Sequence, residues 1–311
     1  MSGTPPLKIG VLMNEHAGAV EAQGTDAIEQ TVFNAFTAAQ FQPLMWTVSG
    51  SELRAAAEKA LAELRAGRLD LIAVVGGDGS IRAVASVFAG TGIPLGIVPM
   101  GTLNHFARDL KIPLDMAEAV ALIASGSVRD VDIGAANGTV FINNSSLGFY
   151  PHLVRARERW RKRRHLPKWL AMLAAAIPLL KHLPLFRFRV RMEGASETCR
   201  SPIVLVGNNE YQIALPGMGR RMRLDGAELA VYIAKAQTLA GLIGLGLRAA
   251  FRRFRPERDL MVLKGKTADI HTRKRRLLAA FDGEVELLHP PLHYEIRPKA
   301  LRVFASEGHI P

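Results

Sequence analysis

The fold of this chain is decided by the stretch Leu69–Ser80, which reads LDLIAVVGGDGS. Leu69–Val75 is a short apolar run typical of a buried strand, and a helical pattern begins at about Ser80. Between them, glycines let the backbone approach a ligand and turn its N–H groups toward an anion, to which the helix start adds its positive dipole end. A tight turn alone explains the pattern less well. The stretch therefore predicts a phosphate site, formed by Gly76, Gly77, Asp78, Gly79 and Ser80.

This turn fits neither of two common phosphate loops, since no Gly-Lys-Ser/Thr follows it and its glycines do not have the G-x-G-x-x-G spacing. A second such turn lies in residues 94–108, PLGIVPMGTLNHFAR, where a strand ends at Gly101 and Thr102 and a helix follows. Taken alone, Thr102 could be an N-cap and Asn104 a turn residue. Because parallel strands end at one edge of a sheet, we expect the two turns to lie together there.

Strand and helix patterns alternate along the first 130 residues. Near-continuous apolar strands that alternate with helices favour a parallel sheet covered on both faces. We expect strands at 7–13, 43–48, 69–75 and 93–98, and helices at 26–40, 51–66 and from about 80.

After about Asp130, short strands follow one another, which favours an antiparallel sandwich or barrel. In Phe186–Met192, apolar residues alternate with Arg187, Arg189 and Arg191, which indicates a strand with one basic face. We expect strands at 139–147, 185–192, 202–207, 227–234, 259–271, 277–288 and 292–305, and helices at 151–182 and about 238–253.

The composition is that of a globular protein, with 49% hydrophobic and 22% charged residues among 311. It excludes disordered, collagen-like and disulfide-stapled classes, and the length suits one large domain or two of about 150 residues. The single cysteine, Cys199, cannot form an internal disulfide. With no apolar run long enough to span a membrane and no secretory signal pattern, we expect a soluble cytoplasmic protein.

The charge is unevenly distributed. Residues 1–150 hold 9 Lys/Arg and 14 Asp/Glu, a net −5, whereas residues 151–311 hold 31 and 14, a net +17. A strongly basic second half indicates a polyanionic partner, either nucleic acid or an anionic membrane.

Two Asp-Gly pairs occur in the second half, at Asp225 and at Asp282. Asp-Gly is a common hairpin turn, and on local sequence alone that interpretation is favoured for the FDGE stretch at Phe281–Glu284. For Asp225, a turn and a cation site are close to equally supported.

Together, the GGDG turn, the P-x-G-I-x-P-x-G-T-x-N-x-F-A-R block and the distant Asp-Gly-Glu resemble the diacylglycerol kinase catalytic family. This family includes sphingosine kinases, ceramide kinases and bacterial lipid kinases. The resemblance extends over nearly the whole chain. It implies an α/β domain of the phosphofructokinase and NAD-kinase type over residues 1–133. A β-sandwich domain with helical insertions would follow over 134–299, and a last strand at about 300–306 would return to the first domain.

The resemblance also implies the site. The hydroxyl proton in a phosphoryl transfer needs a carboxylate acceptor, and the phosphates need cations. Catalysis would fall to Asp282, Glu284 and Asp78. Mg²⁺ would be held by Asp225 and the carbonyls of Met222 and Ala227, which are hard oxygen ligands. ATP would be bound by Asn14, Thr47, Gly76, Gly77, Asp78, Gly79, Ser80, Gly101, Thr102 and Asn104.

Three positions depart from the family pattern. The first loop, Asn14–Gly18, lacks the usual proline, and Ser80 replaces the commoner threonine but keeps its hydroxyl. His105 stands where many members have an aspartate, which removes a carboxylate close to the phosphates.

Basic residues next to apolar helical stretches, with Trp160 and Trp169 nearby, fit binding to anionic lipid, at residues 155–168 and 248–258. Nucleic acid is not expected, since no nucleic-acid-binding motif occurs and aromatic residues are scarce. We therefore predict an ATP- and Mg²⁺-dependent kinase of a diacylglycerol-like or ceramide/sphingoid lipid, peripheral to the inner membrane face. The alternatives are an NAD-kinase-like small-molecule kinase and a non-catalytic lipid- or nucleotide-binding protein.

Overall fold

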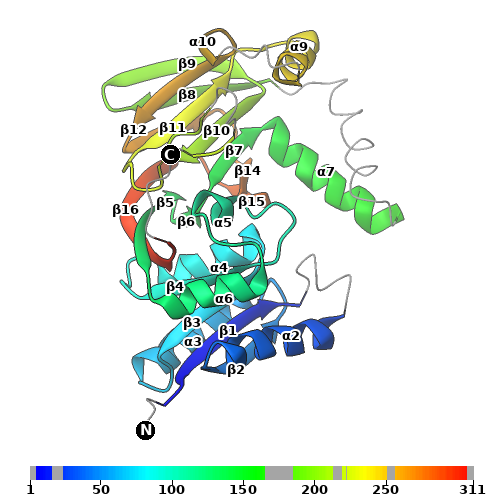
Figure 1. The fold of residues 1–311 in the computed structure, drawn as a ribbon. Helices are drawn as coiled ribbons and strands as arrows, with labels where there is room; N and C mark the ends of the chain where they lie inside the picture. Colours follow the sequence, from blue (N-terminus) through cyan, green and yellow to red (C-terminus); the bar gives the residue numbers. More distant parts are fainter. Residues whose placement is uncertain are drawn as a thin grey trace. The chain divides into compact units, whose positions relative to one another are not determined.

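The computed structural model describes residues 5–15, 24–164, 185–212, 219–221, 223–250 and 256–306 (Figure 1). The chain forms two compact units, of which the first comprises residues 1–133 and 298–311 and the second residues 134–297. Two strands contribute residues to both units: β5, Val128–Ala136, and β16, Leu292–Phe304.

The first unit is an α/β unit whose sheet has the order β2-β1-β3-β4-β16. The neighbouring strands in this order run parallel, as the apolar strand patterns indicate. Its elements are β1 (Leu7–Asn14), α2 (Thr25–Ala38), β2 (Phe41–Val48), α3 (Leu53–Arg65), β3 (Leu71–Gly76), α4 (Asp78–Phe88), β4 (Pro94–Pro99), α5 (His105–Asp109) and α6 (Met116–Ser125).

Helices cover both faces of this sheet. The strand β3 is central, and its residues Ile72–Val75 are fully buried. Helix α2 lies beside α6, and α3 lies beside α4 (Figure 1). Right-handed crossovers in this strand order place the two helix pairs on opposite faces. The helix predicted from about Ser80 begins at Asp78, so the glycine turn leads directly into α4.

The second unit consists of two antiparallel sheets. One has the order β12-β11-β10-β7-β14-β15, and the other contains β16, β13, β8 and β9 in that order. The elements are β6 (Thr139–Phe141), β7 (Asn144–Gly148), α7 (Phe149–Arg164), β8 (Phe186–Met192), β9 (Ala195–Ser201), β10 (Ile203–Asn208), β11 (Leu229–Ala234), α9 (Leu239–Ala250), α10 (Pro256–Asp259), β12 (Leu260–Gly265), β13 (Thr267–Thr272), β14 (Leu277–Phe281) and β15 (Glu284–Leu288).

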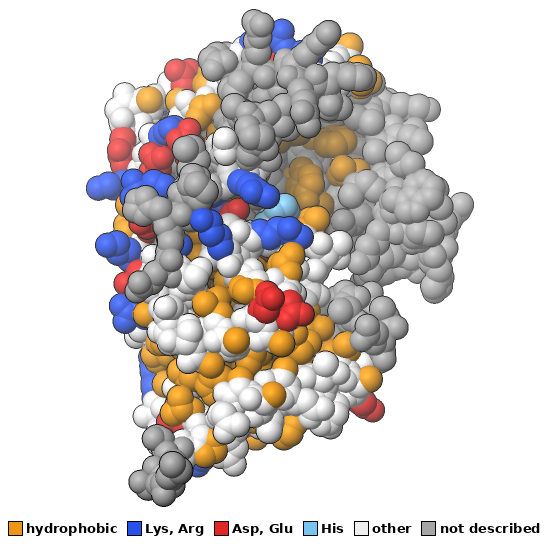
Figure 2. Space-filling model, viewed as in Figure 1, with side chains coloured by type: hydrophobic (Ala, Val, Ile, Leu, Met, Phe, Trp, Pro, Cys, Tyr) orange, Lys and Arg blue, Asp and Glu red, His pale blue; other side chains and the backbone are white. Residues whose placement is uncertain are grey.

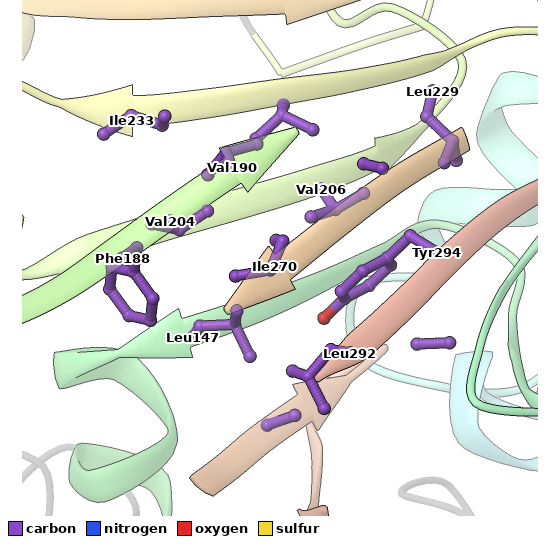
Figure 3. Close-up of a cluster of buried hydrophobic side chains, with 14 of the residues drawn as sticks. Leu147, Phe188, Val190, Val204, Val206, Leu229, Ile233, Ile270, Leu292 and Tyr294 are labelled. Carbon is purple, nitrogen blue, oxygen red and sulfur yellow. The ribbon is translucent and has the colours of Figure 1, made fainter. Parts of the chain in front are cut away.

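One hydrophobic core is shared by the two sheets of this unit (Figure 3). Phe188 and Val190 of β8 contribute to it from one sheet, and Val204 and Val206 of β10 contribute from the other. Tyr294 is fully buried there, and its hydroxyl lies 3.0 Å from Oγ of Ser145. Burial raises the pKa of Tyr294, so the phenol stays neutral and can act as a hydrogen-bond donor.

Three of the predicted strands were wrong in extent, and one of them, 277–288, is divided by a turn at Asp282 and Gly283 into β14 and β15. The run 139–147 is divided into β6 and β7, because the N–H groups of Ile142 and Asn143 turn to a side-chain carboxylate instead of a neighbouring strand. The run 259–271 is divided at Lys266 into β12 and β13, which belong to different sheets. Of the predicted helix 151–182, the part from residue 165 lies outside the described residues.

Two strands were missed by the sequence analysis. The strand β9 reads ASETCRS, has little apolar alternation and forms the edge of its sheet. The strand β5 begins with the polar residues Arg129 and Asp130, where the α/β pattern ends.

The last strand is held in the first unit by two carboxylates from β5. Arg302 Nε and Nη2 donate to Asp130 at 2.7 and 3.1 Å, and Lys299 N donates to Asp132 at 2.8 Å. The Arg302 guanidinium lowers the pKa of Asp130 below its usual value of 3.8. A carboxyl with a lowered folded-state pKa stabilises the fold above its usual pKa, and this contribution is lost as the pH falls through the folded-state value.

We predict that Asp130→Asn lowers the midpoint of thermal unfolding at neutral pH, because it removes the charged pair with Arg302. The difference from the wild type should shrink as the pH falls below about 4, where Asp130 itself becomes protonated. Circular dichroism melts between about pH 7 and pH 3 measure this. A difference that stays constant down to the lowest pH would contradict it.

Candidate nucleotide-binding and catalytic sites

The first candidate site lies at the carboxyl ends of β1 and β3 in the first unit. Strand order reverses here, because β2 lies on one side of β1, whereas β3 and β4 lie on its other side. Such a switch point is the usual ligand position in an open α/β sheet. Asn14 ends β1, and its Nδ2 donates to Oγ of Ser80 at 3.1 Å. The first strand and the glycine turn are thus connected at this edge.

The two glycine turns lie in close contact. The N–H of Met100 donates to the carbonyl oxygen of Gly76 at 2.9 Å. A Cβ atom added at Gly101 would lie 2.5 Å from Cα of Gly77, and one added at Gly77 would lie 3.1 Å from Cα of Gly101. Backbone meets backbone here, so the spacing of the turns requires residues without side chains.

Asp78 joins the two turns. Its carboxylate accepts hydrogen bonds from the N–H groups of His105 at 3.1 Å and Phe106 at 3.0 Å. These groups belong to the first turn of α5, which has no acceptors for them within the helix. This geometry gives Asp78 a positioning function at the start of α5, while its catalytic function stays a prediction.

The second turn is held internally by Asn104. Its side chain accepts from the N–H of Gly101 at 2.8 Å and donates to the carbonyl of Gly101 at 2.9 Å. Asn104 is buried and has φ of 50°, a left-handed conformation that asparagine tolerates. Asn104 therefore shapes the turn, whereas Thr102 is exposed and available to a ligand.

Thr47 lies next to this edge on β2, paired in register with Met13 of β1. Its hydroxyl donates to Oε2 of Glu29 at 2.6 Å. Its predicted contact with a nucleotide stays a prediction.

The chemistry of this edge suits a phosphate chain. Helix α4 begins at Asp78 directly after the turn, and the N–H groups of its first turn have no acceptor within the helix. The positive end of the helix dipole adds to these donors. The Ser80 and Thr102 hydroxyls lie in the same two turns.

The second candidate site is the turn between β14 and β15 in the second unit. Asp282 and Gly283 have φ of 50° and 90°, the conformation of a two-residue hairpin, so the predicted hairpin is present. The Asp282 carboxylate accepts from three backbone N–H groups, those of Ile142 at 2.8 Å, Asn143 at 2.8 Å and Asn144 at 3.0 Å. The turn therefore holds a carboxylate in one fixed position.

Arg221 supports this arrangement and was missed by the sequence analysis. Its side chain is almost fully buried, and Nη1 donates to the carbonyl of Ile142 at 2.6 Å while Nη2 donates to Oδ1 of Asn143 at 2.7 Å. The arginine thus holds the same two residues whose N–H groups hold Asp282. No local pattern around Arg221 distinguishes it from the many exposed arginines of this half.

Glu284 lies on the other side of the hairpin and is exposed. It borders a hollow of about 640 Å³ between α7 and the β14–β15 hairpin. The hollow is mostly apolar, and the charged residues that line it are Glu284 and Arg155. The other lining residues are Val154, Leu278, Gly283, Val285 and Leu287.

The predicted cation site is only partly described, since Met222 lies outside the described residues. Asp225 is exposed and pairs with Nε of Arg223 at 3.1 Å. A Cβ atom at Gly226 would lie 2.7 Å from Oδ1 of Asn209, so an amide oxygen lies beside this loop, and Ala227 has φ of 55°. Within the described part of the chain, no cluster of three or more His, Cys, Asp or Glu side chains could hold a metal.

The predicted basic helices are also described in part. In the segment 248–258, Arg248 and Arg258 both bind Asp259, which is buried, at 2.8 and 3.1 Å. These two arginines have a structural function around a buried carboxylate. Of the segment 155–168, side chains are described only for Arg155 and Ala156.

Comparison with known proteins agrees with this geometry. Residues 8–136 match the family model of the diacylglycerol kinase catalytic domain. A diacylglycerol kinase of Bacillus subtilis is 42% identical over 100 residues, 31% of each chain, and a probable YegS-like lipid kinase of Pseudomonas aeruginosa is 44% identical over 105 residues, 33% of each chain. An uncharacterised Synechocystis protein is 27% identical over 236 residues, 74% of this chain and 53% of its own length.

The fold is also similar over its whole length to solved structures. A Bacillus anthracis protein provisionally assigned as a diacylglycerol kinase has a TM-score of 0.73 and 26% identity, covering 98% of this chain and 97% of its own. These comparisons confirm the resemblance drawn from the sequence, since residues 8–136 match the diacylglycerol kinase catalytic domain. They support the class of lipid kinases. The matched segments span about half of the Synechocystis relative and a third of the other two.

We predict that Gly101→Ala weakens binding of ATP by about 10- to 100-fold, because the new methyl group separates the two turns by a displacement on the scale of an ångström. Titration with a fluorescent ATP analogue measures this. Gly244→Ala is the control, since its Cβ would meet a side-chain atom, Nη1 of Arg248 at 3.0 Å, and no backbone of another segment. Equal affinities of the two variants would contradict the prediction.

We predict that Arg221→Met lowers the free energy of unfolding by about 1–3 kcal/mol, because the buried Asn143 side chain loses a donor, whereas the carbonyl of Ile142 still accepts from Asn208. Urea denaturation measures the loss. Hydrogen exchange of the amides of residues 142–144 should accelerate in the variant beyond its effect on global stability. Wild-type protection of these amides would exclude a positioning function for Arg221.

Proposed function

We propose that this protein is an ATP-dependent lipid kinase that transfers the terminal phosphoryl group of ATP to a lipid hydroxyl. The observation that carries the proposal is the pair of glycine turns at the switch point of the first sheet, joined through Asp78. A phosphate chain placed there would meet the start of α4 and the hydroxyls of Ser80 and Thr102. The family match over residues 8–136 and the kinase relatives support the same class.

In the proposed reaction, the carboxylate of Asp282 accepts the proton of the lipid hydroxyl. The hydroxyl oxygen attacks the terminal phosphorus of ATP, and the bond between this phosphorus and the leaving ADP breaks. The three N–H groups that hold this carboxylate limit its motion and keep it at the end of the β14–β15 hairpin. Glu284 is exposed at the start of β15, and in this proposal it orients the lipid hydroxyl while Asp282 accepts the proton.

The acceptor side of the proposal rests on the hollow beside Glu284. Its lining by Val154, Leu278, Val285 and Leu287 suits an alkyl chain, whereas a polar substrate such as a dinucleotide would leave these side chains facing polar groups. We therefore favour a diacylglycerol-like or ceramide/sphingoid acceptor over the NAD-kinase-like alternative. The bulk of such an acceptor would stay in a membrane, which is consistent with peripheral action at the inner face.

The proposed cation is Mg²⁺. The hard oxygen donors beside the 225–227 loop, the Asp225 carboxylate and the Asn209 amide, fit such an ion chemically, with the carbonyl of Ala227 as a third donor. When bound with ATP, Mg²⁺ neutralises phosphate charge.

We predict that Asp282→Asn lowers kcat for lipid phosphorylation by about 10²- to 10⁴-fold with little change in ATP affinity, because the general base is removed and the nucleotide turns are not. The assay is transfer of radiolabelled phosphate from ATP with Mg²⁺ to total lipid extract in mixed micelles. Identification of the labelled product then names the substrate.

Asp269→Asn is the matched control, since it makes the same chemical change at a half-exposed carboxylate of the same unit. Activity of Asp282→Asn within a factor of two of this control would overturn the assignment of Asp282. If wild-type protein binds ATP and labels no lipid, the non-catalytic alternative replaces the proposed function.

A further inference from the structure

Exposed arginines gather on the outer face of the sheet formed by β8, β9 and β13. The strand β8 alternates strictly, with Phe188 and Val190 in the core and Arg187, Arg189 and Arg191 outside. Arg200 of β9 and Arg273, which directly follows β13, are exposed on the neighbouring segments. We call these five arginines the arginine face.

The register of the strands brings these charges close together. Arg187 lies directly opposite Arg200 across β8 and β9, and Arg189 lies opposite His271 on β13. Opposed side chains of neighbouring antiparallel strands are about 5 Å apart at Cβ, and like charges in such a position destabilise the sheet. Folding therefore leaves an unfavourable concentration of positive charge on this face.

The members of the arginine face form no ion pair with a neighbouring acid among the described residues. Among the residues that the structure describes, none forms an ion pair or side-chain hydrogen bond with any member of the arginine face. Asp269, opposite Arg191, instead contacts Nδ1 of His293 at 2.8 Å, and Glu193 accepts from the N–H of Lys266. The carboxylates closest in register thus have other partners.

Other arginines of the same unit differ in this respect. Arg248 and Arg258 bind Asp259, and Arg297 binds Glu295. In Figure 2, the Lys and Arg side chains on the side shown lie among acidic and uncharged side chains. The arginine face thus differs from Arg248, Arg258 and Arg297, which have acidic partners.

The face is slightly hollowed and rich in donors. A shallow depression of about 270 Å³ is lined by Arg187, Arg189 and Arg191 together with Thr198, His271 and Arg273. Guanidinium groups present forked N–H donors that match phosphate oxygens, often in bidentate pairs. A ligand with several phosphate groups spread over a surface fits this arrangement.

We propose that the arginine face binds the phosphate groups of anionic phospholipids and docks the protein on a bilayer. Alternate residues of a strand are about 7 Å apart and neighbouring strands about 5 Å, so the charges form a plane suited to many head groups at once. Aromatic side chains that could stack on nucleic acid bases are absent from the outward positions of β8, where Phe186 and Phe188 point into the core. This proposal names the membrane contact of the lipid kinase proposed above and rests on it.

The test is sedimentation with vesicles of phosphatidylcholine containing about 30% phosphatidylglycerol, compared with vesicles of phosphatidylcholine alone. Each arginine near an anionic surface contributes about a five-fold factor, so Arg189→Gln/Arg191→Gln should weaken binding to the anionic vesicles by about 30-fold. The wild-type binding should also fall steeply as salt is added.

Arg54→Gln/Arg65→Gln is the matched control, because it removes the same charge from exposed positions of α3 in the first unit. It should bind anionic vesicles within a factor of about two of the wild type, since these arginines lie outside the face. If both double variants lose vesicle binding equally, net charge alone explains the loss and the proposal is overturned. Tighter binding of duplex DNA than of anionic vesicles through Arg189 and Arg191 would also overturn it.

Activity in neutral detergent micelles separates this proposal from the proposed kinase function. There, Arg189→Gln/Arg191→Gln should phosphorylate lipid at the wild-type rate, because no anionic surface is needed. If Arg189→Gln/Arg191→Gln is active and binds anionic vesicles like the wild type, only the docking proposal is overturned. Inactivity of the wild type on every lipid sinks the kinase proposal, while the vesicle measurement still decides whether the face binds phospholipid.

Discussion

The contact between the backbones of Gly77 and Gly101 is the constraint on which the first unit's candidate site depends. It brings the turn after β3 against the turn after β4, at a distance that a single methyl group would exclude. The carboxylate of Asp78 then fixes the start of α5 relative to α4 through two N–H groups. Donors from two separate strand ends become a single surface because these contacts leave them little freedom to separate.

The second unit uses the same device with a different outcome. Asp282, like Asp78, precedes a glycine and accepts hydrogen bonds from backbone N–H groups of a distant segment. In the first unit the carboxylate orders a helix start, whereas in the second the hairpin is ordered around the carboxylate itself. Arg221 extends the second arrangement, since it binds the carbonyl of Ile142 and the side chain of Asn143 from the opposite side. A buried arginine in this position donates to neutral acceptors on the same segment whose N–H groups bind the carboxylate.

Charge has two separate functions in the second unit. Around Asp259, arginines compensate a buried carboxylate, and their contribution is to the stability of the fold. On β8, the alternation of the strand forces every second residue outward, so a core-forming sequence and a basic surface are encoded in the same seven residues. The structure thus separates arginines that pair with a buried carboxylate from arginines that are exposed on the outer face of β8.

The sequence by itself determined the local elements and the edge at which the two glycine turns meet. The glycine turns, the parallel strands of the first unit and the Asp-Gly hairpin all follow from short-range patterns, because strand, turn and helix preferences depend on neighbouring residues. The family resemblance also rested on local motifs. The strand β9 was missed for the same reason, since its stability comes from pairing with β8 and not from its own apolar pattern.

Only the tertiary structure decided which residues meet across long separations. Asp282 contacts a segment about 140 residues earlier, Arg221 reaches the same segment, and Asp78 binds N–H groups 27 and 28 residues later. It also distinguished Arg248, which is paired with Asp259, from Arg189, which is exposed. A hydrogen bond or ion pair forms where the packed strands bring its partners together. The separation of two residues along the sequence does not give their distance in the folded chain.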